Sequence, residues 1–412
     1  MTVYAPGARL LAIAAAGLLL ASCSASTTAT PSPSATPSAT SSSSSSAPAE
    51  SSRPPYPTPP PLAVEDRGLV TLSSIQPEDG VQSVIDFIDE AKETLDIAVY
   101  ELDPSYSPLF EALTRAKDRG VRVRILLSGT IFPPGSTNNN PTDVEILREQ
   151  GFEAELSRPD FSFSHWKVLI SDAGTERARA LICDFNLSSG YFGLDPQYPD
   201  EGDTRGMAVL DTDPADVEVI AKTFDADFPP YSPWPKSDRP GLVWSPSDST
   251  CDSSSCASPY PLEPVGNSRD VMLSLIGNAE TSLDIWVQAL AEPSQLLQPL
   301  LDAIERGVRV RIVGNKGGIN DDALAKLKAA GAQVVQDPTD PTGDGKVMYV
   351  HSKTIVADAG TTKAIAYVGS INPFLDESVD TERELGVLVV DPASIERILQ
   401  IFERDLAAGT PA

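Results

Sequence analysis

The feature that most constrains the fold of this chain is an internal duplication. The segment TLDIAVYEL at 94–102 returns as SLDIWVQAL at 282–290, and RGVRVRIL at 119–126 returns as RGVRVRIV at 306–313. The two spacings are 188 and 187 residues, so almost nothing is inserted between corresponding positions. In a chain of 412 residues, a repeat of this length predicts two copies of one domain-sized unit.

Within each copy, helical and strand patterns alternate. Val84, Ile85, Ile88 and Ala91 fall on one face of a helix over 81–94, and the runs DIAVY and VRVRILL have the β-branched, apolar character of strands. Each RVRI run alternates as a half-buried strand does, which explains it better than a basic patch would. We therefore predict an α/β fold of two repeated halves, each a mixed β-sheet flanked by helices.

The N-terminus has the features of an export signal. Arg9 precedes the apolar run 10–20, which suits a signal peptide but is too short to span a bilayer. The junction Leu-Ala-Ser-Cys that ends at Cys23 resembles the bacterial lipobox; the alternative is an ordinary cleaved signal with an incidental cysteine. We expect residues 1–22 to be a lipoprotein signal peptide, and Cys23 to anchor the protein to the outer face of the cell membrane.

Composition divides the remaining chain into four parts. Residues 23–62 are rich in Ser, Thr and Pro, cannot bury enough apolar surface to fold, and are expected to be a tether. The two halves are expected at 63–228 and 265–412, joined by a Pro/Ser-rich connection at 229–264.

The cysteines, the net charge and the hydrophobic content restrict the structures and partners that this protein can have. Cys251 and Cys256 lie in a polar loop, where an exported protein can join them as a local disulfide; a metal site is the weaker alternative, because no further Cys or His accompanies them. The net charge of −27 argues against a nucleic-acid partner, since such proteins neutralise phosphates with basic residues. A hydrophobic content of 41% excludes wholesale disorder.

The chain has only two histidines, and both begin the same motif. Each copy has a histidine, a lysine two residues later and an aspartate seven residues later: His165, Lys167 and Asp172, then His351, Lys353 and Asp358. Both histidines meeting this pattern by chance has a probability of roughly a few in a million. In an extended strand, the histidine and lysine point to the same side. Asn186 and Asn372 follow the aspartates by fourteen residues, and the second asparagine ends the run GSIN that contains Ser370.

This double His-x-Lys-x4-Asp motif resembles the signature of the phospholipase D superfamily, over about residues 70–405. The resemblance implies two halves packed with one active site at their interface, and phosphodiester chemistry that needs no metal or cofactor. It also implies that one histidine attacks phosphorus, while the other protonates the leaving alcohol. By this analogy His165 is favoured as the nucleophile and His351 as the acid.

The residue types suit this chemistry independently. Histidine is a nucleophile and base near neutral pH, because its pKa lies there. The lysines supply positive charge, and the asparagines and Ser370 supply donors, for a phosphoryl transition state. We expect Asp172 and Asp358 to orient the imidazoles or lysines.

The first copy departs from the pattern. Where the second copy reads GSIN, the first reads Cys183-Asp184-Phe185-Asn186. Cys183 is expected to be a buried small hydrophobic residue. Glu384 matches a glutamate that the family often uses beside its histidine, and Gly206 takes its place in the first copy. The sites are therefore unequal, and the carboxylate of Asp184 raises the question of how an anionic substrate is accommodated.

Two classes of function remain open. The leading interpretation is a membrane-anchored, monomeric phospholipase D that hydrolyses a phospholipid or exchanges its headgroup. A cardiolipin-synthase-like phosphatidyltransferase or a nuclease would use the same chemistry. The other class is a non-enzymatic envelope protein on the same scaffold. Headgroup preference cannot be derived from the sequence.

Overall fold

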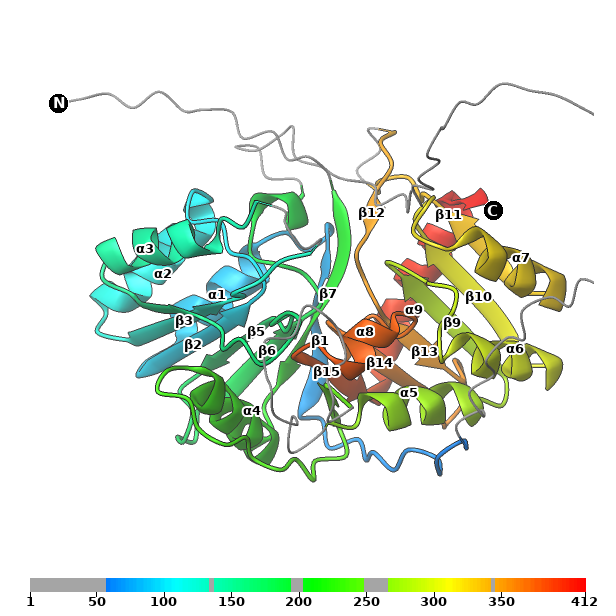
Figure 1. Ribbon diagram of the computed structural model, residues 1–412, viewed down its shortest axis with the longest axis horizontal. Helices are drawn as coiled ribbons and strands as arrows, with labels where there is room; N and C mark the ends of the chain where they lie inside the picture. Colours follow the sequence, from blue (N-terminus) through cyan, green and yellow to red (C-terminus); the bar gives the residue numbers. More distant parts are fainter. Residues whose placement is uncertain (1–56, 133–136, 194–202, 248–265, 342–344) are drawn as a thin grey trace, which may run out of the picture. The chain divides into compact units, whose positions relative to one another are not determined.

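The computed structural model describes residues 57–132, 137–193, 203–247, 266–341 and 345–412. Every described helix and strand belongs to one compact unit, residues 58–412. Within that unit, two α/β halves lie side by side (Figure 1). The predicted fold class is confirmed.

The first half is one mixed sheet flanked by helices. Its strands are β1 (Val70–Gln76), β2 (Thr94–Val99), β3 (Arg122–Leu127), β4 (Glu153–Leu156), β5 (Val168–Ser171), β6 (Arg179–Cys183) and β7 (Thr204–Asp211). Its helices are α1 (Gln82–Glu90), α2 (Ser107–Asp118), α3 (Asn140–Glu149) and α4 (Pro214–Asp227), with a short 3-10 helix, η1 (Ser189–Tyr191).

The second half has the same composition of elements. Its strands are β8 (Leu242–Ser245), β9 (Ser282–Val287), β10 (Arg309–Gly314), β11 (Gln333–Gln336), β13 (Ile355–Ala357), β14 (Ile365–Gly369), β15 (Glu384–Val389) and β16 (Thr410–Pro411). Its helices are α5 (Ser268–Gly277), α6 (Leu297–Glu305), α7 (Asp321–Ala330), α8 (Asp376–Asp380) and α9 (Pro392–Ala408). The short strand β12 (Tyr349–Val350) pairs with β7 of the first half.

The duplication extends to the order of the strands. The first sheet runs β1-β7-β6-β5-β2-β3-β4, and the second runs β8-β15-β14-β13-β9-β10-β11, with β16 beyond β11. In both sheets three neighbouring strands, β2-β3-β4 or β9-β10-β11, are parallel, and the other strands in this order pair antiparallel, whereas β12 pairs parallel with β7. Corresponding strands therefore carry corresponding motif residues to the same place in each half.

Two of the segment boundaries expected from composition differ in the structure. The connection 229–264 contains β8, which pairs with β15, so the second sheet begins earlier than the Pro- and Ser-rich composition indicated. The expected tether 23–62 also ends earlier, because the carbonyls of Pro59 and Pro60 accept hydrogen bonds from Asn278 and Ser274. Cys23, Cys251 and Cys256 lie outside the described residues. No helix in the described part of the chain is long and apolar enough to cross a bilayer.

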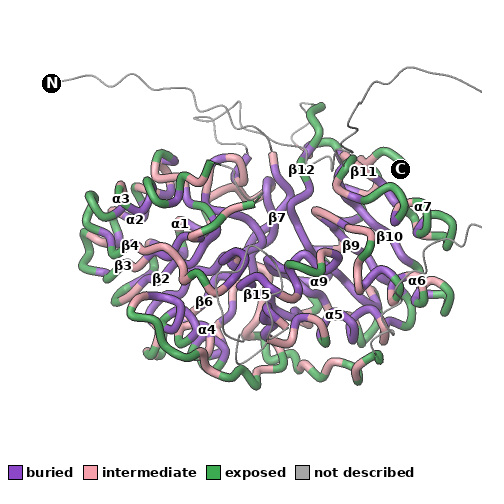
Figure 2. Tube along the Cα trace, viewed as in Figure 1, coloured by how far each residue is buried: buried purple, intermediate pink, exposed green. Residues whose placement is uncertain are grey.

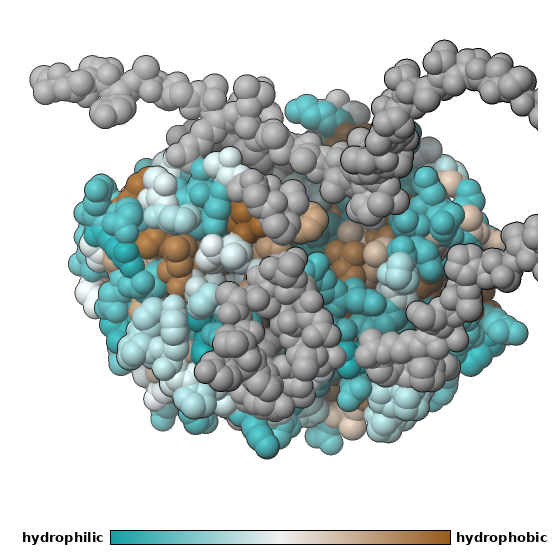
Figure 3. Space-filling model, in the orientation of Figure 1, coloured by the Kyte–Doolittle hydropathy of each residue, from teal (hydrophilic) through white to brown (hydrophobic). Residues whose placement is uncertain are grey.

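The two halves share one hydrophobic core. A single cluster of buried side chains includes Trp166 and Phe224 from the first half and Trp286 and Phe402 from the second. The strands in the middle are buried, whereas the outer helices α1–α3 and α6–α7 present exposed residues (Figure 2). Among the described residues, hydrophilic ones prevail along the margin of the face seen in Figure 3, and hydrophobic ones are visible nearer its middle. The burial of apolar side chains across the junction stabilises the halves as one body.

The arginines of the RVRI runs confirm the interpretation as strands. Arg124 in β3 donates to Asp96 in β2 at 2.6 Å, and Arg311 in β10 donates to Asp284 in β9 at the same distance. Both guanidinium groups are mostly buried. These two arginines are therefore committed to the sheets, whereas the first arginine of each run, Arg122 or Arg309, is exposed.

Two reciprocal ion pairs join the halves. Arg205 in β7 contacts Asp405 in α9 at 2.7 Å, and Arg383, just before β15, contacts Asp227 in α4 at 2.9 Å. All four side chains are buried. Each arginine thus pairs with the last helix of the opposite half, so the two pairs are equivalent under the internal duplication.

We expect Arg205→Met to lower the free energy of unfolding by about 3–5 kcal/mol, because it leaves the Asp405 carboxylate buried without its cation. Urea denaturation measures this loss. The double variant Arg205→Met/Asp405→Leu is expected to lose much less, since no buried charge remains unpaired. A double variant as unstable as the single one would show that the loss comes from packing.

Candidate active site

Each histidine is held in place by the opposite half. The backbone N–H of His165, three residues before β5, donates to the carbonyl of Arg383 at 2.8 Å. The N–H of His351, directly after β12, donates to the carbonyl of Arg205 at 3.1 Å. The arginines of the reciprocal ion pairs therefore also carry the backbone carbonyls that position the histidines.

The motif lysines lie beside their histidines and are buried. The ammonium groups of Lys167 and Lys353 donate to the backbone carbonyls of His165 and His351 respectively. Burial lowers the pKa of Lys167 to about 8 and that of Lys353 to about 7. The charge of Lys353 acts on His165, and the charge of Lys167 acts on His351. The two motifs thus share one electrostatic environment.

His165 has a carboxylate partner. Its Nδ1 lies 2.8 Å from Oε2 of Glu384, the first residue of β15, and the other oxygen of Glu384 accepts the hydroxyl of Ser378. Burial works against ionisation of Glu384, but His165 and Lys167 hold its pKa below the ordinary value. An ionised Glu384 accepts the Nδ1 proton, which leaves the lone pair of His165 on Nε2. Burial lowers the pKa of His165 to about 4, so the ring is neutral near pH 7.

His351 has different neighbours. The ammonium of Lys353 lies 3.1 Å from its Nδ1, and the backbone carbonyl of Asp184 favours the protonated imidazole. Burial and the nearby lysines lower the pKa of His351 well below its ordinary value. Gly206 stands where the second half has Glu384. The two histidines therefore differ in the way their asymmetric sequences suggested.

Glu382 forms a second carboxyl group beside His165. Its Oε2 lies 3.7 Å from Nδ1 of His165, and burial together with the charge of Glu384 raises the pKa of Glu382 well above its ordinary value. Among the described residues, His165, Glu382 and Glu384 have ligand-type atoms within 4.8 Å of one another. A cation there would have to displace the Nδ1 proton and share the site with two ammonium groups. The group is better explained as a histidine with its proton acceptors.

The asparagines line the same region. Nδ2 of Asn186 donates to the hydroxyl of Tyr191 at 3.2 Å, and the backbone N–H of Asn372 donates to Ser378 at 2.8 Å. The Oδ1 atoms of both asparagines are buried and have no hydrogen-bond partner among the described residues. Ser370, expected as a donor to substrate, instead bonds the backbone N–H and carbonyl of Leu385, each at 3.2 Å. It ties the end of β14 to β15, and the expectation for this residue was wrong.

The two motif aspartates lie away from the histidines. The carboxylate of Asp172 accepts the backbone N–H groups of residues 92–94 at 2.6–3.2 Å, and that of Asp358 accepts those of Glu280 and Thr281 at 2.8 and 2.7 Å. The expectation that these aspartates orient the imidazoles or lysines was therefore wrong. Seven residues of extended chain span about 20 Å, which puts the aspartates at the far end of β5 and β13. There they hold the turns that lead into β2 and β9.

Sequence reasoning missed several neighbours of the histidines. The ring of Tyr100 meets His165 edge-on with centroids 4.9 Å apart, and the ring of Tyr191 meets His351 at 5.0 Å. Glu382 and Ser378 were also missed. The position of Tyr100 directly after β2 was the available signal, because ligands bind beyond the carboxyl ends of parallel strands.

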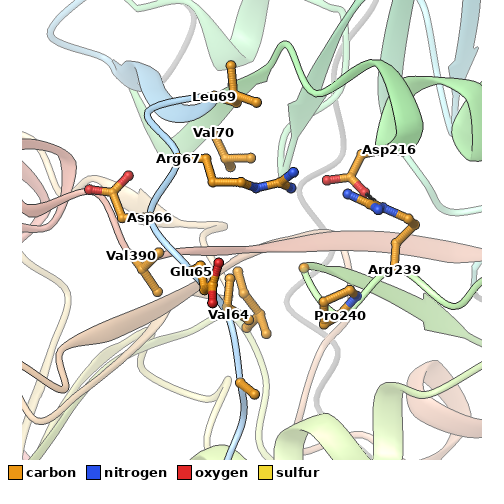
Figure 4. Close-up of a pocket in the computed structure, with 13 residues that line it drawn as sticks. Val64, Glu65, Asp66, Arg67, Leu69, Val70, Asp216, Arg239, Pro240 and Val390 are labelled. Atoms are coloured by element: carbon orange, nitrogen blue, oxygen red, sulfur yellow. Dashed lines mark hydrogen bonds and ion pairs between the residues drawn. The ribbon is translucent and has the colours of Figure 1, made fainter.

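Two further features lie outside the two motifs. Cys183 is a buried free thiol at the end of β6, and burial raises its pKa well above the ordinary value, as expected of an inert core residue. A cavity of about 350 Å³ lies under the segment 63–70 (Figure 4). The arginines in it, Arg67 and Arg239, already pair with Asp213, so it shows no group that awaits a ligand.

Comparisons with known proteins agree with this geometry. Residues 84–227 and 272–406 match the protein family described as "Cardiolipin synthase, PLD-like domain". A search of curated proteins found no significant match. The two matched ranges coincide with the two halves and together make up more than half of the chain.

Solved structures share the fold at low sequence identity. The phosphatidylserine synthase of Haemophilus influenzae Rd KW20 is 12% identical with a TM-score of 0.56, over 85% of this chain and 89% of that one. The polyphosphate kinase of Porphyromonas gingivalis is 15% identical with a TM-score of 0.53, over 82% of this chain. This chain spans about half, 51%, of that kinase. Nuc of Salmonella typhimurium, described as a phospholipase D family member, is 23% identical over 35% of this chain and 90% of that one, with a TM-score of 0.30.

Proposed function

Because the chain belongs to the phospholipase D superfamily, whose members are phosphodiesterases and phosphatidyltransferases, we propose that it transfers a phosphatidyl group from a phospholipid through a phosphohistidine. The observation that carries the proposal is the 2.8 Å contact between Nδ1 of His165 and Glu384, which leaves Nε2 free to attack. The second motif supplies a histidine from the opposite half, as a two-histidine reaction requires.

In the first step, Nε2 of His165 attacks phosphorus, and the bond between phosphorus and the headgroup oxygen breaks. The proton that this oxygen gains comes from His351. Glu384 stabilises the positive charge that forms on His165, by accepting the Nδ1 proton. His351 is neutral in the free protein, and the negative phosphodiester beside it favours its protonation.

In the second step, an alcohol or water attacks the phosphohistidine. His351, now neutral, accepts the proton of the attacking oxygen, and the P–N bond to His165 breaks. Throughout, Lys167 and Lys353 stabilise the charge on the non-bridging phosphoryl oxygens, and the side-chain amides of Asn186 and Asn372 face the same region. The second step leaves His351 protonated, as it was in the substrate complex, and the proton that it took up on substrate binding returns to solvent when the product leaves.

The reaction that resolves the phosphohistidine distinguishes hydrolysis from transfer to an alcohol. The leading interpretation of the sequence was phospholipid hydrolysis, with transfer as the alternative. The matched family description names cardiolipin synthase, and one structure with the same fold is a phosphatidylserine synthase. These comparisons support transfer to an alcohol at least as well as hydrolysis, and we take transfer as the principal reaction.

The test is product analysis with the full-length protein. Vesicles of phosphatidylcholine, phosphatidylethanolamine or phosphatidylglycerol are incubated with the protein, with and without glycerol. The lipid products are identified by mass spectrometry. Transfer predicts a new phosphatidyl-alcohol that increases with the alcohol concentration, and hydrolysis predicts phosphatidate alone. Plasmid DNA and bis(4-nitrophenyl) phosphate are included to detect nuclease or generic activity. No product from any substrate would favour the non-enzymatic interpretation.

Lys167→Met is expected to lower kcat/KM about 10²–10³-fold, because it removes one positive charge from the phosphoryl group while methionine fills the buried space. Lys363→Met is the matched control, since Lys363 is 62% exposed and pairs with Glu280 on the surface. Steady-state rates on bis(4-nitrophenyl) phosphate provide the measurement. Equal activity of the two variants would remove Lys167 from the mechanism.

We also propose that Cys23 carries the lipid anchor that holds the protein at the outer face of the cell membrane. The sequence around Cys23 is the support for this. Cys23→Ser is expected to release the protein from the membrane fraction and to abolish incorporation of labelled palmitate. Retention of both properties would contradict the anchor.

A further inference from the structure

Asp184 occupies the position of Ser370 in the first half, and both side chains make the same backbone contact. Oδ1 of Asp184 accepts the N–H of Met207 in β7 at 2.7 Å, as the hydroxyl of Ser370 accepts the N–H of Leu385 in β15 at 3.2 Å. The structural task of tying one strand to the next therefore needs only a hydroxyl. The carboxylate at 184 adds a buried negative charge that this task does not require.

The neighbouring position differs in a compensating way. Gly206 is the counterpart of Glu384, and a Cβ atom built on Gly206 would lie 2.8 Å from Oδ1 of Asp184 and 2.8 Å from Phe185. Because these distances are too short, position 206 cannot carry a side chain while Asp184 and Phe185 keep their present positions. Asp184 thus places a carboxylate in the space next to position 206, whose counterpart in the second half is Glu384.

The surroundings of Asp184 identify what this carboxylate acts on. Lys353 is the cation that most favours its ionised form, with Lys167 as a weaker contributor. Conversely, Asp184 is the carboxylate that most favours the charged form of Lys353, whereas Glu384 has this role for Lys167. Met207, whose N–H bonds Asp184, also accepts the hydroxyl of the residue after Lys353 through its Sδ at 3.4 Å. The charged forms of the two lysines are therefore favoured most by carboxylates from different halves.

We propose that Asp184 is a positioning residue that keeps Lys353 charged, and that it replaces in the first half the carboxylate missing from position 206. The kinetic part of this inference rests on the proposed function; the electrostatic part does not. The departure Cys-Asp-Phe-Asn is then a relocation of the carboxylate within one half. It also accounts for how an anionic substrate is accommodated, because the negative charge of Asp184 is balanced by Lys353.

The inference has a pH signature. Burial and the charge of Lys167 lower the pKa of Lys353 to about 7, and Asp184 opposes this shift. Glu384, Glu382 and His351 are the other titratable groups around the lysine. Without the negative charge at 184, the pKa of Lys353 falls further, so Lys353 loses its proton at a lower pH. We expect a decrease of about one pH unit, the effect typical of losing an opposite charge at close range.

The experiment measures this titration directly in the full-length protein. Lysine labelled with ¹³C at Cε is incorporated, the Lys353 resonance is assigned with Lys353→Arg, and its midpoint is followed by NMR from pH 5 to 10. Asp184→Asn keeps the acceptor for Met207 and removes the charge. Asp211→Asn is the matched control: Asp211 is also fully buried and also accepts a backbone N–H, that of Asp213 at 2.8 Å.

The expected result is a midpoint about one pH unit lower in Asp184→Asn, and unchanged in Asp211→Asn. A midpoint in Asp184→Asn within about 0.3 pH unit of the wild type would overturn the inference. The alkaline limb of kcat/KM on bis(4-nitrophenyl) phosphate is expected to move with the midpoint. If the NMR shift occurs but the protein turns over no substrate, the proposed function fails while the inference holds.

Variants that copy residues of the second half into the first test whether the carboxylate at position 184 replaces one at position 206. Asp184→Ser/Phe185→Ile copies Ser370 and Ile371 of the second half, and is expected to lower the Lys353 midpoint as Asp184→Asn does. Adding Gly206→Glu restores a carboxylate at the position of Glu384, and is expected to raise the midpoint again toward the wild-type value. A triple variant with the same midpoint as the double variant would contradict the relocation.

Discussion

His165→Ala is expected to lower turnover of bis(4-nitrophenyl) phosphate by about four orders of magnitude, because it removes the atom that attacks phosphorus. His351→Ala is expected to cause a similar loss with phospholipid substrates, whose alkoxide leaving group needs a proton. Nucleophile and acid act as a unit, so the double variant should lose little more than either single variant. Initial rates with both substrates measure these effects.

The leaving group separates the roles of the two histidines. Nitrophenolate is a stable anion that needs no proton, so His351→Ala should retain a burst of nitrophenol equal to one turnover, and His165→Ala should show none. The Asp211→Asn variant controls for loss of a buried polar side chain away from the two histidines, at the end of β7. If either histidine variant kept more than about a tenth of the wild-type rate on phospholipid, the two-histidine mechanism would be wrong.

Glu384→Gln is expected to lower kcat/KM about 10³-fold, the second largest effect. Glutamine keeps the size of the side chain but cannot stabilise the imidazolium, and its amide N–H can donate to Nδ1 and so move the ring proton to Nε2, the attacking atom. Ser378 would remain in place to hold the side chain. The loss is therefore expected in kcat, with little change in KM.

Glu382→Gln provides the matched comparison. Glu382 is buried in the same place, two residues away, but its raised pKa favours the neutral form, which glutamine resembles in charge and size. We expect it to lose less than about tenfold, far less than Glu384→Gln. Parallel losses in the two variants would show that the glutamates act together, and would contradict the assignment of Glu384 alone to His165.

Much of the fold could be predicted because the same sequence pattern of helices and strands occurs twice in the chain. The repeated segments around β2 and β9 gave the duplication, and alternation within the RVRI runs gave strands, since periodicity follows from backbone geometry. The strand β8 was missed because four residues between prolines carry too little periodicity to outweigh their composition. The position of β8 depends on its pairing with β15, which lies far away in the sequence.

The site was predictable in its reacting groups and less so in its supporting contacts. His165, Lys167, His351 and Lys353 lie together as the double motif predicted. The roles of Asp172 and Ser370 depend on which backbone N–H groups reach them, and such contacts come from turns and neighbouring strands that the motif does not contain. Glu382, Ser378 and Tyr191 come from segments whose positions depend on how the halves pack.

A trapped covalent intermediate would identify the nucleophilic histidine. The full-length His351→Ala variant is mixed with bis(4-nitrophenyl) phosphate, quenched at alkaline pH because phosphohistidine is labile in acid, and examined by intact mass and peptide mapping. We predict one nitrophenylphosphoryl group per chain, on His165, and no adduct in His165→Ala. An adduct on His351, with the burst retained in His165→Ala, would reverse the two roles, and the absence of any adduct would contradict covalent catalysis by this protein.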